Sequence, residues 1–227
     1  MTKTAPVSAI IPLFNGRRFI RQAIESILAQ ELRPREIIVV DDGSTDGGNS
    51  QCSDYPEVRL ICQPNRGEAA ARNRGIREST QPLIAFLDQD DLWLPQKLAF
   101  QVQKLEVDPS VDMVFGQHRI FVEGNAQWFR RDLLGQTLTA ELPGTLVIRR
   151  TVFERVGFYR EDMSLGSDID WICRANDAGI SVHLVEEVLL LRRVHQANAS
   201  RDQALFTNGL LRLARASARR KRGQLAD

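Results

Sequence analysis

The sequence predicts an α/β protein with a mixed, mainly parallel central sheet flanked by helices. Apolar, β-branched runs alternate with helix-like segments four times in about 100 residues, which is typical of strand–helix units joined by right-handed crossovers. Acidic residues directly follow two of these runs, at Asp41-Asp42 and at Asp88-Gln89-Asp90-Asp91. The carboxyl ends of parallel strands are where open α/β sheets bind ligands. The sequence therefore also predicts a binding site at this edge of the sheet.

The first half of the chain supplies the strand–helix units. The expected strands are Val7–Leu13, Glu36–Val40, Val58–Cys62 and Leu83–Leu87, and the expected helices are Arg17–Gln30, Glu68–Glu78 and Pro95–Glu106. The strands are nearly continuous apolar runs, as expected of strands buried on both faces. The first helix repeats apolar residues every three or four positions. Proline at position 95 suits the first turn of a helix.

After Asp108-Pro109 the pattern is less regular. The expected strands are Val111–Val122, Thr145–Ile148, Ser181–Val185 and Val188–Arg193, and the expected helices are Thr151–Val156 and Asp168–Ala178. Gly179 suits the end of the last helix because glycine readily adopts the left-handed conformation found there. We expect residues 1–200 to form one domain on one continuous sheet, with different substrates bound by residues 1–108 and 109–200. Residues 201–227 are expected to form a basic helical tail.

Composition and charge limit the class of protein. Of the 227 residues, 26% are charged and 43% hydrophobic, which is ordinary for a soluble globular protein. Lys and Arg total 30 against 29 for Asp and Glu, so no overall positive field favours nucleic acid. The three cysteines lack C-x-x-C spacing, so neither a disulfide framework nor a zinc site is indicated.

The sequence also bears on location. Its first residues lack the apolar core of a signal peptide, and no apolar run reaches the length of a membrane span. We therefore expect a cytoplasmic protein. The basic tail, with Arg219-Arg220-Lys221-Arg222, is expected to be a solvated terminal helix, and peripheral contact with anionic lipid at the inner membrane face is the alternative.

The second acidic group needs a positive partner. Two like charges about 4 Å apart repel by about 4 kcal/mol at an effective dielectric constant near 20. Mg²⁺ and Mn²⁺ prefer carboxylate oxygens, and Mg²⁺ often completes its shell with substrate phosphates. The cluster Asp88–Asp91 therefore predicts a divalent metal beside phosphate. A turn or capping role is the alternative for either acidic group taken alone.

The first acidic group has a different expected partner. Asp41-Asp42 could accept hydrogen bonds from a base or a ribose, as acids after the second strand of dinucleotide-binding folds do. The first strand, however, is followed by Asn15-Gly16 rather than by G-x-G-x-x-G. A dehydrogenase-type dinucleotide fold is therefore disfavoured.

Four motifs, in order and at matching spacing across residues 7–97, resemble those of the family 2 glycosyltransferases of the GT-A fold. They are V-S-A-I-I-P-L-F-N at 7–15, I-V-V-D-D-G-S-T-D at 38–46, N-R-G at 65–67 with A-R-N-R-G-I at 71–76, and F-L-D-Q-D-D-L-W at 86–93. The resemblance implies a GT-A fold with its nucleotide-binding half first and its acceptor half second. It implies inverting, single-displacement sugar transfer from a nucleotide-diphosphate sugar, most often a UDP-sugar, to a saccharide or lipid-linked acceptor. It also implies Mn²⁺ or Mg²⁺ as cofactor.

The resemblance gives roles to individual residues. The residues that would bind the nucleotide are Pro12, Phe14, Asn15, Asp41, Asp42, Gly67 and Arg72. Among them Asp42, with Asp41, would read the nucleobase. Asp88 would face the ribose or donor sugar, and Asp90 would bind the metal. Asp91 matches the family as well, with capping of the following turn as its alternative.

Two further motifs lie in the second half. L-G-S-D-I-D-W at 165–171 resembles the family segment G-E-D-x-D-L-W, and the implied general base is Asp168, with Asp170 as the other possibility. Ser167 replaces the usual Glu, which removes any role of that acid; helix capping is the alternative for Asp168. R-R-V-H-Q-A-N-A-S at 192–200 resembles a late family motif. There His195 would contact the metal or diphosphate, and Arg193 or Arg192 would neutralise phosphate oxygens.

Two other classes of function remain open from the sequence. A nucleotidyltransferase would carry a glycine-rich, basic loop for a triphosphate after its first strand, and Phe14–Arg18 resembles such a loop only faintly. A non-catalytic domain that binds sugar nucleotides is supported only by Ser167.

Overall fold

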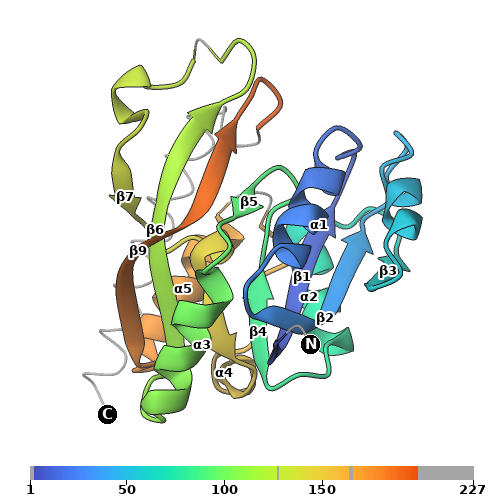
Figure 1. Ribbon diagram of the computed structural model, residues 1–227. Coiled ribbons are helices and arrows are strands. Elements are labelled where there is room, and N and C mark those ends of the chain that lie inside the picture. Colours follow the sequence, from blue (N-terminus) through green and yellow to red (C-terminus); the bar gives the residue numbers. More distant parts are fainter. Residues whose placement is uncertain (1–2, 127, 164–165, 199–227) are drawn as a thin grey trace.

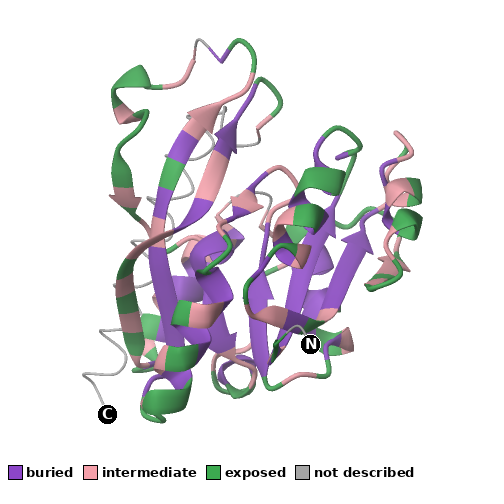
Figure 2. Cartoon of the chain, viewed as in Figure 1, coloured by how far each residue is buried: buried purple, intermediate pink, exposed green. Residues whose placement is uncertain are grey.

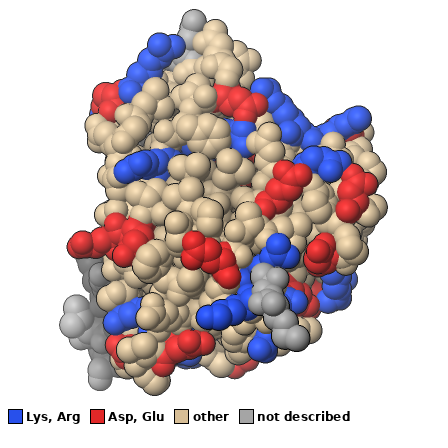
Figure 3. All heavy atoms as spheres, in the orientation of Figure 1, with Lys and Arg blue, Asp and Glu red and all other residues tan. Residues whose placement is uncertain are grey.

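The computed structural model describes residues 3–126, 128–163 and 166–198, and Figure 1 shows one continuous sheet with helices on both faces. The tail predicted over residues 201–227 lies outside the described residues. Within the described part, no helix is long and apolar enough to cross a membrane. Figure 3 shows acidic and basic side chains interspersed over this face of the molecule, in keeping with the balanced composition.

The first half contains the parallel strand–helix units that were predicted. Its elements are β1 (Thr4–Leu13), α1 (Ile20–Leu28), β2 (Arg33–Asp41), η1 (Asn49–Asp54), β3 (Val58–Cys62), α2 (Glu68–Glu78), β4 (Leu83–Phe86) and α3 (Lys97–Val107). Strand β1 pairs in parallel with β2 and β4, and β2 pairs in parallel with β3. Helix α1 starts three residues later than predicted because Arg17 is held in a loop, where its N–H donates to Asp46 Oδ2 at 2.8 Å.

The second half extends the same sheet with mixed pairing. Its elements are β5 (Leu92–Trp93), β6 (Met113–Val122), η2 (Arg131–Leu133), β7 (Thr137–Thr139), η3 (Pro143–Thr145), β8 (Val147–Arg149), α4 (Thr151–Val156), α5 (Ser167–Asp177) and β9 (Val182–Val194). The strand order is β3-β2-β1-β4-β8-β6-β9-β5, with β7 beside β6. Strand β8 is antiparallel to β4 and β6, whereas β9 is parallel to β6.

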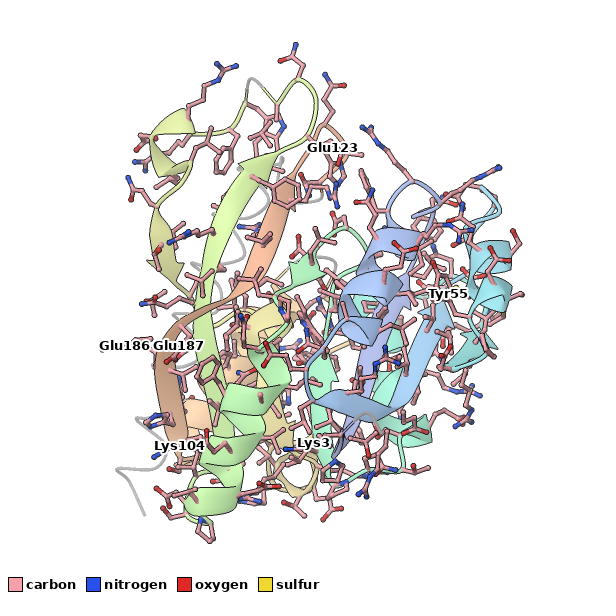
Figure 4. All side chains as sticks on the ribbon, in the orientation of Figure 1. Lys3, Tyr55, Lys104, Glu123, Glu186 and Glu187 are labelled. Atoms are coloured by element: carbon pink, nitrogen blue, oxygen red, sulfur yellow. The ribbon has the colours of Figure 1, made fainter. Side chains whose placement is uncertain are left out.

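The prediction of two strands over residues 181–193 was wrong, because β9 is one strand. Glu186 and Glu187 interrupt its apolar run and lie on the outer side of β9 in Figure 4. The pairing with β6 shifts register around them and then continues. An irregularity that retains backbone pairing therefore looked like a loop in the sequence.

The buried side chains of the sheet face two layers of helices. Side chains alternate between faces along β1, so Ile11 packs toward α1 and α3 while Ile10 packs toward α2, α4 and α5. Figure 2 shows β1, β2 and β4 buried along most of their lengths. On α2, Gly75 allows close approach to the sheet, because a Cβ atom there would lie 2.4 Å from Ile10 Cγ2.

This topology gathers the predicted site residues. Strands β1, β2 and β4 are parallel neighbours, so their carboxyl ends share one edge of the sheet (Figure 1). The pairing of Leu92 with Leu191 then places the segment after β9 beside Asp90 and Asp91. Residues from three separate motifs therefore meet at one edge.

Candidate active site

The acidic pair after β2 is engaged by the protein itself. Asp41 and Asp42 are each 2% exposed. Asp41 accepts hydrogen bonds from the Ser44 N–H through Oδ1 and from Asn49 Nδ2 through Oδ2, both at 3.0 Å. Asp41 therefore closes the loop that leads from β2 into η1.

Asp42 holds the segment that enters α2. It accepts hydrogen bonds from Gln63 Nε2 at 2.7 Å, from the Arg66 N–H at 3.0 Å and from the Gly67 N–H at 2.7 Å. Gly67 has φ +92°, a left-handed conformation that glycine adopts without strain. To bind a nucleobase, Asp42 would have to accept a hydrogen bond through an oxygen lone pair that these three donors do not occupy.

The loop after β1 places an aromatic ring at the site. Asn15 has φ 49° and joins this loop to the next, because its Oδ1 accepts from the Thr45 N–H at 2.8 Å. Pro12 is buried near the end of β1, whereas the Phe14 side chain is exposed. Of the residues predicted to frame the nucleotide, Phe14 is thus the one whose ring is open to a ligand.

The turn after β4 is tied to this loop by Gln89. Its Oε1 accepts from the Phe14 N–H at 2.8 Å, and its Nε2 donates to the Phe14 carbonyl at 3.0 Å. A Cβ atom on Gly16 would lie 2.3 Å from Gln89 Oε1, so glycine leaves room for the amide. The role of Gln89 could not be predicted from the sequence, because the middle residue of a D-x-D motif carries no signal of this contact.

Arg72 joins two carboxylates on different elements. Its buried Nη2 donates to Asp88 Oδ1 at 2.7 Å and to Glu68 Oε1 at 2.6 Å, and its guanidinium lies 5.8 Å from the centre of the Tyr159 ring. The Asp88 side chain is 33% exposed and so stays open to a ligand. Arg72 therefore holds the Asp88 carboxylate in place from the buried side, and Arg72 itself is largely shielded from solvent.

Asp90 and His195, which belong to separate motifs, are in contact. Asp90 Oδ2 lies 2.9 Å from His195 Nε2 and accepts from Asn198 Nδ2 at 3.1 Å. The Ala197 N–H donates to His195 Nδ1 at 3.2 Å, which assigns the imidazole proton to Nε2 in this state. The imidazole also packs against the Phe19 ring, with 4.6 Å between centroids.

Asp90 and His195 fit a divalent cation. Adjacent ligands in an octahedral shell at about 2.1 Å from the metal lie about 3 Å apart. The 2.9 Å between Asp90 Oδ2 and His195 Nε2 matches this spacing, and Nε2 can bind the metal once the imidazole proton moves to Nδ1 and the contact of Nδ1 with the Ala197 N–H is released. In the described part of the chain no cluster of three His, Cys, Asp or Glu ligands occurs, so water and a diphosphate would supply the remaining ligands, as is usual for Mg²⁺.

Asp91 is part of the support of this turn. Its buried Oδ1 accepts from the Arg193 N–H at 2.8 Å. Burial, followed by repulsion from Asp90 and Asp88, raises the pKa of Asp91 well above its usual range. These contacts favour the structural alternative for Asp91.

Arg193 packs inside the protein. Its guanidinium lies 4.8 Å from the centres of both the Phe19 and Phe121 rings, and it donates to the Asp90 carbonyl at 2.7 Å and to Gln22 Oε1 at 2.6 Å. It also pairs with Glu123, labelled at the end of β6 in Figure 4. Phosphate neutralisation by Arg193 therefore stays a prediction, and it would require Arg193 to leave this packing.

Asp168 lies in the first turn of α5, half-buried. The helix has no side-chain cap, so the structure does not show the capping alternative for Asp168. The charge of Asp168 raises the pKa values of Glu68, Arg72 and Tyr159. Asp170, by contrast, is buried and paired with Arg174 Nε at 2.9 Å, so it is poorly placed to act as a base.

Glu68 is a second site residue that was not among the residues predicted from the sequence. Its place in the first turn of α2, four residues before Arg72, was the available signal. Arg72 lowers the pKa of Glu68, but desolvation and the charges of Asp88, Asp168 and Asp90 outweigh this and raise it to about 7. The Glu68 side chain is 54% exposed, so water screens part of this repulsion.

The description "glycosyl transferase family 2" belongs to the family model that matches residues 8–169. The chain belongs to this family. It is 30% identical over 210 residues to the uncharacterized glycosyltransferase RT0329 of Rickettsia typhi, covering 86% of this chain and 65% of that protein. It is 32% identical over 194 residues to the uncharacterized glycosyltransferase YibD of Escherichia coli, covering 76% of this chain and 53% of that protein. The chain thus spans about half to two thirds of these relatives.

Solved structures confirm the predicted GT-A fold. The mannosyltransferase PcManGT from Pyrobaculum calidifontis, in complex with GDP-Man and Mn²⁺, matches with a TM-score of 0.72 at 21% identity, over 94% of this chain and 64% of that chain. Residues 1–349 of S. aureus TarS, in complex with UDP-GlcNAc, match with a TM-score of 0.71 at 16% identity, over 85% of this chain and 59% of that chain.

Proposed function

We propose that this protein transfers a sugar from a nucleotide-diphosphate sugar to an acceptor hydroxyl, with inversion at the anomeric carbon. One observation carries the proposal: Asp88, paired with Arg72, and Asp90, paired with His195, lie in one turn at the carboxyl edge of the sheet, and the charge of Asp168 raises the pKa of the same Arg72. Membership of glycosyl transferase family 2 supports the reaction class. The bound UDP-GlcNAc and GDP-Man of the two fold relatives support a nucleotide sugar as donor, and a UDP-sugar is our first candidate.

Two groups of residues would hold the donor. The exposed Phe14 ring and the loops held by Asn15, Asp41 and Asp42 would frame the nucleoside, with Gly67 at the margin of its pocket. Asp88, fixed by Arg72, would accept hydrogen bonds from ribose or sugar hydroxyls. Asp90 and His195 would hold Mn²⁺ or Mg²⁺, which when bound supplies positive charge to the leaving diphosphate.

Asp168 would act as the general base. As the acceptor oxygen attacks the anomeric carbon, Asp168 would take the proton from that hydroxyl while the bond to the diphosphate breaks. A positioned base contributes about 10²–10⁴-fold to the rate. We assign the donor to residues 1–108 and a saccharide or lipid-linked acceptor to residues 109–200, within one domain.

A thermal-shift screen tests this proposal. UDP- and GDP-sugars are added to the full chain with and without Mn²⁺, at concentrations well above the dissociation constant. A ligand at its dissociation constant stabilises by only about 0.4 kcal/mol, whereas a 100-fold excess stabilises by about 2.7 kcal/mol. We expect Mn²⁺-dependent stabilisation by at least one nucleotide sugar. Stabilisation by none, or release of pyrophosphate from a nucleoside triphosphate and a sugar phosphate, would count against the proposal.

A further inference from the structure

The margin of the site carries more negative charge than metal binding requires. Glu68, at the start of α2, and Asp88, after β4, share a single amino group of Arg72. The charge of Asp168, at the start of α5, raises the pKa values of Glu68 and Arg72 in the same cluster. Three carboxylates around one guanidinium leave a net negative charge when all are ionised.

The pKa of Glu68 reflects the negative electrostatic potential in this region. The Glu68 side chain forms an ion pair with Arg72 at 2.6 Å, an interaction that by itself favours the charged form. Desolvation and the charges of Asp88, Asp168 and Asp90 nevertheless raise the pKa of Glu68 to about 7. A further negative charge is therefore unfavourable at this position even beside an arginine.

Glu68 also borders the space in which the reaction would occur. Glu68 and Asp88 accept hydrogen bonds from the same amino group of Arg72, at 2.6 and 2.7 Å, so Glu68 lies beside the carboxylate that would face the donor sugar. Its side chain is 54% exposed, while the Arg72 that anchors it is 3% exposed. A ligand in this space would therefore meet the carboxylate of Glu68 and not the cation behind it.

We propose that the donor sugar is neutral, and that Glu68 is the residue that selects against uronic-acid donors. This inference rests on the proposed glycosyl transfer and names the class of sugar. The exposed carboxylate accepts a hydrogen bond from a sugar hydroxyl. A sugar carboxylate offers no such donor and is repelled by the three carboxylates, so a missing bond and a repulsive contact act together.

The test compares two donors that differ only at C6. Isothermal titration of the full chain in Mn²⁺ at about pH 8, above the raised pKa of Glu68 so that its carboxyl is charged, measures UDP-glucose against UDP-glucuronate, or GDP-mannose against GDP-mannuronate if guanine is the preferred base. We expect the uronate donor to bind about tenfold more weakly or worse. Glu68→Gln, which keeps the size of the side chain and removes its charge, should reduce this ratio by about threefold or more. Glu68→Ala should do the same.

Glu106→Gln is the matched control, because it removes one exposed negative charge from α3 outside the site. It should leave the ratio unchanged. Equal binding of the two donors by the unmodified protein, or an unchanged ratio in both Glu68 variants, overturns the inference and leaves the proposed function standing. Failure of every nucleotide sugar to bind overturns the proposed function instead.

Discussion

The two acidic groups of this protein follow β2 and β4, the buried strands on either side of β1, yet only one group is open to a ligand. Asp41 and Asp42, 2% exposed, accept five hydrogen bonds from the loops that they close. Asp88 and Asp90 keep 33% and 20% of their side chains exposed, and their partners hold them from behind. This difference indicates that a carboxylate at the end of a strand stays available to ligands only where it does not accept hydrogen bonds from nearby backbone N–H groups.

The largest expected effect comes from Asp168, the proposed base beside the open group. Asp168→Asn should lower the transfer rate by about 10²–10⁴-fold and leave donor affinity nearly unchanged, because the amide keeps the shape but cannot take a proton. Turnover assays and calorimetry measure the two quantities. Asp170→Asn is the control; near-normal turnover in Asp168→Asn would reject the assignment of the base.

The next effect concerns the open group itself. Asp90→Ala should weaken Mn²⁺-dependent donor binding by about 10–100-fold, because one of two protein ligands is lost and His195 loses its partner. Donor titrations with and without Mn²⁺ measure the change. Equal metal dependence in Asp90→Ala and in the unmodified protein would show that the cation binds elsewhere.

The closed group should respond in stability rather than in chemistry. Asp42→Asn should destabilise the protein by about 2–3 kcal/mol, because an amide cannot accept all three hydrogen bonds and an N–H group would be left buried without a partner. Urea unfolding gives this value. A loss of donor affinity without a loss of stability would mean that Asp42 belongs with the open group.

A smaller change should follow from Asp41. Asp41→Asn retains one acceptor oxygen and disturbs only the loop between β2 and η1, so we expect a loss of about 1 kcal/mol. The same urea titration measures it, in parallel with Asp42→Asn. A larger loss than for Asp42→Asn would reverse the ranking of the two carboxylates.

The sequence predicted the motif-bearing half better than the remainder. The bounds of β3 and α2 were predicted correctly, because both segments have clear flanking residues, and the GT-A class was confirmed. The two-residue β5 and three-residue β7 are too short to leave a pattern. The metal roles of Asp90 and His195 were assigned from motif resemblance, and they stay predictions.

Contacts that depend on long-range packing could not be predicted. The sequence marked Arg193 as a candidate for phosphate because of its charge, whereas its burial between Phe19 and Phe121 depends on three distant segments. Glu68 and Gln89 were missed for the same reason. Gln89 pairs with Phe14, 75 residues away, and Glu68 shares the amino group of Arg72 with Asp88, which lies 20 residues from Glu68; no periodic signal links these distant segments.

The side-chain amide of Gln89 forms the same pair of hydrogen bonds with the backbone of Phe14 that a neighbouring strand would form. It thereby extends the pairing of β1 beyond the end of the strand. The loop around Phe14 and the turn that carries Asp90 are thereby joined into a single mechanical unit. If a base stiffens that loop, it also restrains the metal turn. Nucleotide and cation should therefore bind with positive, reciprocal cooperativity. Gln89→Ala removes the amide and both hydrogen bonds, so it should make the two binding events independent.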